Sequence, residues 1–449
     1  MKQLAMCALV LGLTLSGLNA QTITAERSPA NQTVGIDPSV PIVVQFSESI
    51  SSDRISKAIS VHGELSGPLD SDFKLNKDQK SLSIDLSDAP MAGEKVKVEI
   101  TRDLFPEGFA GMSWEFFTKT ERSFLEFNKS FEIPLRLPGE APLQPSQAYG
   151  GDLNQDHYSD ISIPTSNPED LRVLLNDGTG HYQRMEVFPL ELGAELSTKG
   201  ADFNKDGALD LALLPKGKNL GLLLGGNSST FLTGNSVDAS SSSGSFSIFD
   251  FDLDGDEDVA LANTDRITLL TNDGTGNFSK SAFDPRGIGE SSICSGHANQ
   301  DGIPDLFVGF SQSNQMGILL GNGKGGFHPS GLVKLPASPS LIKAADFNGD
   351  GNTDVILASK TNNLFMVSLG DGTGGYSEPT AYALQQAQSP SGIAIGDLDG
   401  DLDLDLVTSY SGSGTFVIWE NNALGVFSKV QSFSIDGEAT TVLLHDKDR

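Results

Sequence analysis

Short runs in which apolar and polar residues alternate recur along most of the chain, separated by clusters of Gly, Asp and Asn. Residues 404–409 are one such run, directly after an acidic cluster. Alternation with a period of two is typical of β-strands, and long stretches with helical periodicity are missing. The sequence therefore predicts an all-β protein.

A nine-residue acidic pattern recurs six times: Asp, any residue, Asp or Asn, any residue, Asp, usually Gly, two residues of any type, then Asp. The copies begin at Asp152, Asp202, Asp250, His297, Asp346 and Asp397. A Gly/Asn-rich turn follows each copy and ends in an aromatic residue: Tyr182, Phe231, Phe278, Phe327, Tyr376 and Phe427. A period of about 50 residues is typical of propeller blades. In the sixth unit we expect four strands, at 393–396, 404–409, 415–420 and 426–434.

The two ends of the repeat region predict how a ring would close. Residues 440–448 match the first strand of a seventh unit, and residues 124–137 resemble the last strands of a unit. One blade made from both ends would remove the free strand edges of an open ring. We therefore expect a seven-bladed β-propeller over residues 121–449, with six blades as the alternative.

The N-terminal region lacks the repeat. Lys2, the apolar residues 4–15 and the small-residue cleavage site ending at Ala20 predict a secretory signal peptide at 1–20. Strand-like runs at 42–46, 82–86, 96–100 and 114–117 then predict a β-sandwich over 21–120. We expect it to be an independent domain whose removal leaves the propeller folded.

The net charge of the chain disfavours some classes of partner, and its cysteine content excludes disulfides as a source of stability. The formal net charge is −29, which disfavours nucleic acid and anionic membranes as partners. After the signal peptide the chain has one cysteine, Cys294, so a disulfide framework is excluded. No later segment has the roughly 20 apolar residues that span a bilayer. We expect a secreted, cell-surface or periplasmic monomer.

The acidic loops have the composition of calcium sites. Alternate oxygen-bearing side chains converge when such a loop wraps, and calcium takes six to eight hard oxygen ligands. The candidate ligands are Asp152, Asn154, Asp156 and Asp160; Asp202, Asn204, Asp206 and Asp210; Asp250, Asp252, Asp254 and Asp258; Asn299, Asp301 and Asp305; Asp346, Asn348, Asp350 and Asp354; Asp397, Asp399, Asp401 and Asp405. Magnesium demands stricter geometry, and zinc would need His or Cys ligands. An EF-hand is excluded because the twelfth position is apolar or Thr in every copy.

The six copies are not equivalent. The pattern is complete in the second, third and fifth copies. His157 and Leu402 replace the glycine in the first and sixth copies, where positive φ is uncommon for His and strained for Leu. His297 replaces the first carboxylate of the fourth copy. We expect the fourth site to be weak or empty and the sixth loop to be distorted.

These acidic loops and glycine-rich turns, such as residues 176–180 and 272–276, resemble the FG-GAP/VCBS repeat family, whose propeller form is found in the integrin alpha-subunit head. The resemblance covers about residues 123–449 and implies calcium in the hairpin between the first and second strands of a blade. Residues 28–29, 35–38 and 41–48 resemble a bacterial Ig-like domain.

The sequence offers no recognised catalytic constellation. The histidines are scattered, and neither a Gly-x-Ser-x-Gly elbow nor a His-Glu-x-x-His motif occurs. The loops between second and third strands should lie on the face opposite the acidic loops; they are polar, and Tyr410 is their one aromatic residue. The first interpretation is a non-catalytic adhesion or protein-interaction module that binds an extracellular protein or glycan. The alternative is a glycan-binding or polysaccharide-cleaving propeller.

Overall fold

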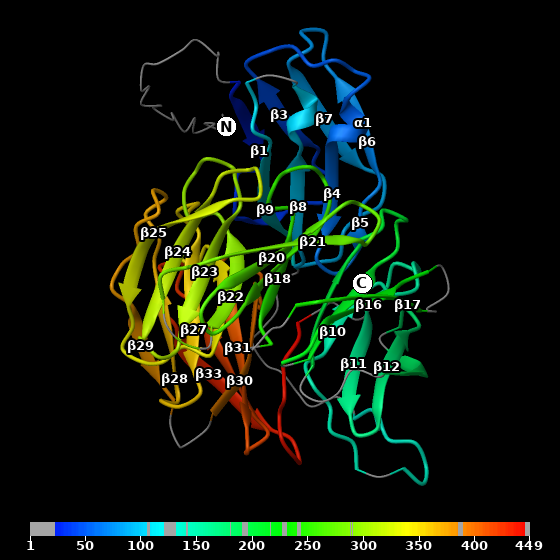
Figure 1. Cartoon of the computed structure of the whole chain (residues 1–449), viewed down its shortest axis with the longest axis vertical. Coiled ribbons are helices and arrows are strands. Elements are labelled where there is room, and N and C mark those ends of the chain that lie inside the picture. The colour runs from blue at the N-terminus through cyan, green and yellow to red at the C-terminus, as the bar shows by residue number, and fades with distance from the viewer. Residues whose placement is uncertain are drawn as a thin grey trace.

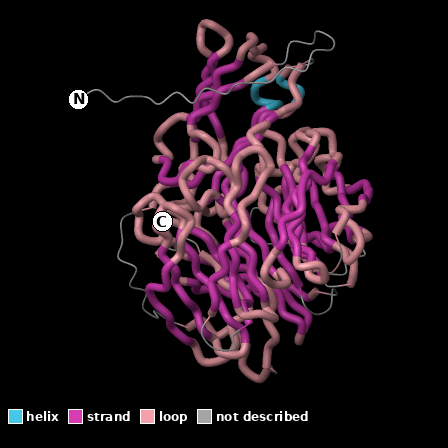
Figure 2. Tube along the Cα trace, turned by 90° about the vertical axis from the view of Figure 1, so that its left-hand side faces the viewer, coloured by secondary structure: helices cyan, strands magenta, loops and turns pink. Residues whose placement is uncertain are grey.

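The computed structural model describes residues 23–444 except 106–107, 121–131, 141, 180, 191–195, 216, 227–230, 240–243, 288, 290 and 385–388. Its regular structure is almost entirely β-strand; the described residues add one α-helix, α1 (Ile55–Ala58), and one 3-10 turn, η1 (Arg102–Leu104). None of the described helices is long and apolar enough to cross a membrane. An N-terminal sandwich stands above the sheets of the repeat region (Figure 1), and the same arrangement is seen from the side in Figure 2.

The N-terminal sandwich, residues 23–120, consists of two sheets around one apolar core. One sheet has the order β1 (Ala25–Ser28), β3 (Ile42–Phe46), β7 (Ser81–Leu86), β6 (Ser71–Leu75). The other has the order β2 (Thr33–Ile36), β9 (Met112–Thr118), β8 (Lys95–Ile100), β4 (Ile59–Gly63), β5 (Gly67–Pro68). In β3 every second side chain is buried, as the alternating pattern predicts. The four strands expected from the sequence are β3, β7, β8 and β9.

The repeat region forms six four-stranded antiparallel sheets, called blades 1 to 6. Blades 1 to 3 are β10 (Tyr149–Gly151), β11 (Asp160–Ser166), β12 (Glu169–Asn176), β13 (Tyr182–Pro189); β14 (Leu196–Ala201), β15 (Asp210–Pro215), β16 (Leu220–Leu224), β17 (Leu232–Val237); β18 (Phe246–Phe249), β19 (Asp258–Ala262), β20 (Ile267–Asn272), β21 (Phe278–Phe283). Blades 4 to 6 are β22 (Ser291–Gly296), β23 (Asp305–Phe310), β24 (Gln315–Gly321), β25 (Phe327–Lys334); β26 (Leu341–Ala345), β27 (Asp354–Ser359), β28 (Leu364–Ser368), β29 (Thr380–Ala383); β30 (Ser389–Gly396), β31 (Asp405–Ser411), β32 (Thr415–Glu420), β33 (Ser428–Ser434). The first strands of successive blades contact one another, so the blades form a β-propeller.

The two sequence landmarks of the repeat meet across the boundary between blades. Phe203, the second residue of the second acidic loop, packs edge to face on Phe278 of the next blade, with ring centroids 5.7 Å apart. Phe347 and Phe427 repeat this contact at 5.6 Å. The turn residue Asn272 also donates from Nδ2 to the Phe203 carbonyl at 2.9 Å. The constant phase of loop and aromatic therefore reflects a repeated contact between neighbouring blades.

Residues 441–444 lie where the ring closes, between blades 6 and 1. Val442 packs against Gly392 of β30: a Cβ added to Gly392 would lie 2.9 Å from the backbone nitrogen of Val442. Leu443 packs near Gly150 of β10. Within the described part of the chain, residues 132–148 and 440–444 contain no β-strand. Residues 124–131 and 445–448 lie outside the described part. The described residues of the repeat region thus form six four-stranded sheets, and residues 442–443 lie beside Gly392 and Gly150.

Candidate metal centres beneath the N-terminal sandwich

Each acidic loop joins the first and second strands of its blade, and in every loop except the fourth, which begins with His297, the chain wraps around the first carboxylate of the pattern. In the second loop Asp202 accepts backbone N–H bonds from Asp206 at 3.2 Å and from Gly207 at 2.9 Å. The first, third and fifth loops repeat both bonds. Gly207 has a φ of 86°, which an L-residue rarely adopts. Glycine at this position of the pattern therefore allows the wrap without backbone strain.

The ninth carboxylate of the pattern holds the blade together. Asp210 is fully buried; one of its oxygens accepts the N–H of Phe203 at 2.9 Å, and the other accepts the N–H of Gly225 at 2.7 Å. The same two bonds, from the loop and from the end of the third strand, recur in every copy: Asp160, Asp210, Asp258, Asp305, Asp354 and Asp405. The sequence predicted this residue as a calcium ligand, and the spacing gave no sign that it also links the acidic loop to the end of the third strand.

The third and sixth loops bring three carboxylates together. Oxygens of Asp250, Asp252 and Asp254 all lie within 4.8 Å of one another in the third loop. In the sixth loop the same holds for Asp397, Asp399 and Asp405. In the other four loops an Asn takes the place of the second acid, and its Nδ2 donates to the next Asp at 2.9–3.0 Å. The all-acid loops lack this internal donor, so they have the greatest need of a cation.

Burial makes the third loop costly to ionise without a counter-ion. It raises the pKa of Asp250 to about 8, with further repulsion from Glu99 of the sandwich. Burial also raises the pKa of Asp254 to about 6, with Asp252 adding to the shift. Oδ1 of Asp252 is buried without a hydrogen-bond donor. These hard oxygen donors, one of them unsatisfied, fit a calcium ion.

The residues that depart from the pattern have different effects. His157 and Leu402 adopt the same left-handed conformation as the glycines they replace, with φ of 69° and 79°. The sixth loop keeps the left-handed turn, but Leu402 N–H lies 3.3 Å from Asp397 Oδ2, and Gly400 N–H rather than Asp401 N–H donates to Oδ1, at 2.7 Å. Its wrap therefore differs from that of the complete loops, and Leu402 is strained. His297 is buried, and burial lowers its pKa to about 4. The fourth loop thus has a neutral ring where other loops have a carboxylate.

The N-terminal sandwich covers the acidic face of the propeller. The N–H of Ser113 donates to the Gly302 carbonyl in the fourth loop at 2.8 Å, and the Thr120 hydroxyl donates to Asp397 Oδ2 in the sixth at 3.1 Å. Three more contacts join the first, second and third loops to the sandwich: Asp152 N–H with Leu65 O at 2.8 Å, Leu209 with Gly67, and Leu253 O with Arg102 N–H at 3.3 Å. Sequence reasoning missed this interface because its contacts join residues far apart in the chain.

A second cluster lies in this interface, where ligand atoms of His62, Glu99 and Glu257 come within 4.8 Å of one another. Lys97 already pairs with both acids: its Nζ lies 2.9 Å from Glu99 and contacts Glu257. Burial lowers the pKa of His62 to about 4. The cluster is therefore an ion-pair network that joins the sandwich to blade 3.

The opposite face, called the open face, carries the turns between the second and third strands, whose described residues are 167–168, 217–219, 263–266, 311–314, 360–363 and 412–414. Tyr410 is fully buried, and its hydroxyl shares a 2.6 Å hydrogen bond with Thr408 Oγ1. It therefore cannot stack on a ligand at the surface. Lys218 and Lys360 are exposed in these turns, while Lys216 lies outside the described residues.

Comparison with known proteins identifies FG-GAP-like repeats: that family model matches residues 298–357 and 346–408. No curated protein matches the sequence. Among solved structures, an Agrocybe aegerita lectin that recognises non-reducing terminal N-acetylglucosamine has a TM-score of 0.45 at 16% identity, over 84% of this chain and 90% of that chain. BBS1N in complex with ARL6DN gives 0.47 at 14% identity, over 68% and 85%. A functionally unknown protein from Desulfotomaculum acetoxidans gives 0.42 at 14% identity, over 62% and 77%.

Proposed function

We propose that this chain is an exported, calcium-binding β-propeller that acts as a non-catalytic adhesion or protein-interaction module. In this proposal residues 1–20 are a signal peptide, residues 21–120 are an Ig-like domain, and residues 121–449 are the FG-GAP/VCBS propeller. The mature protein is a secreted, cell-surface or periplasmic monomer, and its partner is an extracellular protein or glycan.

The convergence of Asp250, Asp252 and Asp254 carries the calcium assignment. Their oxygens lie within 4.8 Å of one another, and Oδ1 of Asp252 is buried without a donor. A divalent cation would offset the repulsion among these acids and replace the missing hydrogen bond. The donor set contains only oxygen, which favours calcium over zinc. The main effect of the ion is to stiffen the hairpins of the propeller.

The interaction role is supported by the surface that the sandwich leaves uncovered. The acidic loops face the sandwich, so a partner has access to the open face and to the outer end of the sandwich. The described turns of the open face are polar, and Lys218 and Lys360 are exposed there. The residues of these turns include no recognised nucleophile and base pair, which favours binding over catalysis.

Equilibrium dialysis against calcium and against magnesium, followed by metal analysis of the protein, tests the metal assignment. Asp254→Ala should lose bound calcium. Asp265→Ala is the matched control, because Asp265 is exposed and pairs with its neighbour Arg266 outside the acidic loops. The wild-type chain should retain calcium in preference to magnesium. Equal, negligible retention of both metals would contradict the assignment.

A glycan array in calcium buffer and a polysaccharide depolymerisation assay separate the interaction role from the alternative. The proposal predicts no turnover of any polysaccharide. Release of oligosaccharides by the wild-type chain would replace the proposal with a polysaccharide-cleaving enzyme.

A further inference from the structure

A cavity of about 480 Å³ lies on the axis of the propeller. Its wall is built from the first strands of the blades, and the sandwich closes one end through residues 62–64, 67–68, Lys95 and Lys97. The lining also includes Lys360, an exposed residue of the turn between β27 and β28, so the cavity extends toward the open face. This volume is typical of a site for a small molecule.

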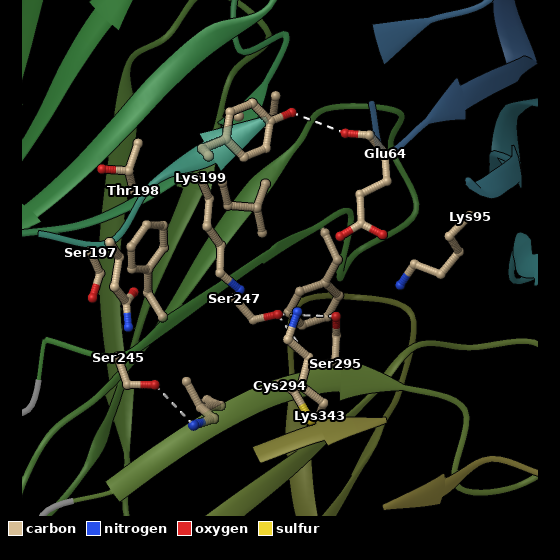
Figure 3. Close-up of a pocket in the computed structure, with 18 of the residues that line it drawn as sticks. Glu64, Lys95, Ser197, Thr198, Lys199, Ser245, Ser247, Cys294, Ser295 and Lys343 are labelled. Atoms are coloured by element: carbon tan, nitrogen blue, oxygen red, sulfur yellow. Dashed lines mark hydrogen bonds between the residues drawn. The ribbon is translucent and has the colours of Figure 1, made fainter. Parts of the chain in front are cut away.

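Two lysines from opposite sides of the ring face this cavity. Lys199 lies on β14 of blade 2, and Lys343 lies on β26 of blade 5. Figure 3 shows their amino ends directed into the same space, beside Ser247 and Ser295. Neither lysine forms an ion pair with a carboxylate in the described part of the chain, and Glu64, which also lines the cavity, lies beyond ion-pair distance of both.

The two lysines that the sandwich contributes to the cavity, by contrast, form ion pairs with carboxylates. Lys95 pairs with Glu115 at 3.3 Å, and Lys97 pairs with Glu99 and Glu257. Lys199 has only the face of Phe246, with its Nζ 5.6 Å from the ring centroid. Burial lowers the pKa of Lys199 to about 8, and the charge of Lys343 adds to that shift. Lys199 is half-buried and Lys343 is accessible. Two cations that repel one another across one cavity are less favourable than the same pair joined by an anion.

Hydroxyl groups in the same wall are free to donate. Oγ1 of Thr198 and Oγ of Ser292 have no hydrogen-bond partner, although each residue is only 5% exposed. Both residues line the cavity. Ser247 donates to Ser295 at 3.0 Å, which leaves the Ser295 hydroxyl proton available. Buried polar groups without partners mark places where a ligand or water completes the hydrogen bonding.

We propose that the axial cavity binds a small organic or inorganic dianion, with its oxyanion groups held between Lys199 and Lys343 and by the neighbouring hydroxyls. Dicarboxylates and phosphates share this chemistry. The ligand would enter from the open face, because the sandwich closes the other end. The lysines and hydroxyls of this site are not among the predicted ligands of the acidic loops, although Asp202 and Leu209 of the second loop also line the cavity.

Isothermal titration of the full chain without added calcium, which citrate would chelate and phosphate would precipitate, tests the proposal with succinate, citrate and inorganic phosphate as probes and with glucose as a neutral control. At least one anionic probe should bind and raise the melting temperature, and glucose should do neither. Preference for succinate or citrate identifies a carboxylate ligand, and preference for phosphate identifies a phosphorylated one. No binding of any anionic probe to the wild-type chain would overturn the proposal.

Three lysine variants localise the site. Lys199→Met should weaken binding of the best probe at least tenfold and abolish its thermal shift, while the ligand-free protein melts no lower than wild type, because an unpaired buried charge has been removed. Lys199→Arg should retain binding. Lys218→Met, in an exposed turn outside the cavity, is the matched control and should bind as wild type. Unchanged affinity in Lys199→Met, or an equal loss in Lys218→Met, would contradict the site.

Discussion

Phe116 and Phe117 are neighbours on β9, yet their side chains belong to different cores. Phe116 packs inside the N-terminal sandwich, with 2% of its surface exposed. Phe117, 6% exposed, packs with Phe347, Phe365 and other residues of blades 5 and 6. The last strand of the sandwich therefore contributes to both parts of the molecule, which makes residues 21–120 less independent than the sequence suggests.

Replacing each of these two rings should weaken a different part of the protein. Phe117→Ala should cost about 3 kcal/mol of unfolding free energy through the docking of the sandwich on the propeller. Hydrogen exchange should then rise in the acidic loops while β3 and β8 stay protected. Phe116→Ala, the matched control, should raise exchange in β3 and β8. The same exchange pattern in both variants would contradict the shared role of β9.

The ninth carboxylate of each loop should stabilise the blade with or without metal. Asp210→Asn places an amide donor against the N–H of Phe203 or of Gly225, and should cost about 2 kcal/mol. Denaturant unfolding should show that loss in calcium and in chelator alike. Asp206 is exposed and accepts bonds from Asn204 Nδ2 and Ala208 N–H of its own loop. Asp206→Asn should therefore cost stability mainly in calcium. A loss of stability at Asp210 that disappears in chelator would show that this residue stabilises the protein mainly as a metal ligand and not through its backbone hydrogen bonds.

Replacing Leu402, the residue with positive φ in the sixth loop, by glycine should relieve backbone strain. Leu402 has a φ of 79° and a side chain that is 57% exposed but contacts Gly35 of the sandwich. Leu402→Gly should be more stable than Leu402→Ala by about 1 kcal/mol, because both lose the contact and only glycine loses the strain. Denaturant unfolding in saturating calcium measures this difference. Equal stabilities would show that the loop is not strained there.

The tail should hold the ring closed between blades 6 and 1. Leu443 lies near Gly150 of β10, so Leu443→Ser should lower the melting temperature by a few degrees and promote aggregation through exposed strand edges. Deletion of residues 440–449 should do so more strongly. Leu424→Ser is the control, since Leu424 is 64% exposed. Thermal unfolding with size-exclusion chromatography would detect the effect, and a monomeric deletion variant with unchanged melting would contradict it.

Local patterns predicted much of the fold. The alternation of apolar and polar residues located β3, β7, β8 and β9, and the spacing of acidic loop and aromatic turn located all six repeats, because each repeat folds through local hairpins and a contact with its neighbour. The short strands β1, β2 and β5 lacked enough alternating residues to stand out. The candidate ligands of each loop were predicted individually from the sequence. The hydrogen bonds of Asp210 to two backbone N–H groups and the contact of the sandwich with the acidic loops were not predicted. Both depend on packing between distant residues, which the spacing of residues in one sequence does not reveal.

The central claim is that cations in the acidic loops stabilise this propeller, and thermal unfolding in calcium and in chelator tests it most directly. At a hundredfold excess over its dissociation constant, calcium should add roughly 2.7 kcal/mol for each independent site and raise the melting temperature. Asp254→Ala, in the buried third loop, should lose a clear part of this shift, and Asp301→Ala, in the fourth loop where His297 replaces a carboxylate, should lose less. Identical melting curves for calcium-saturated and metal-stripped wild-type protein would contradict the account.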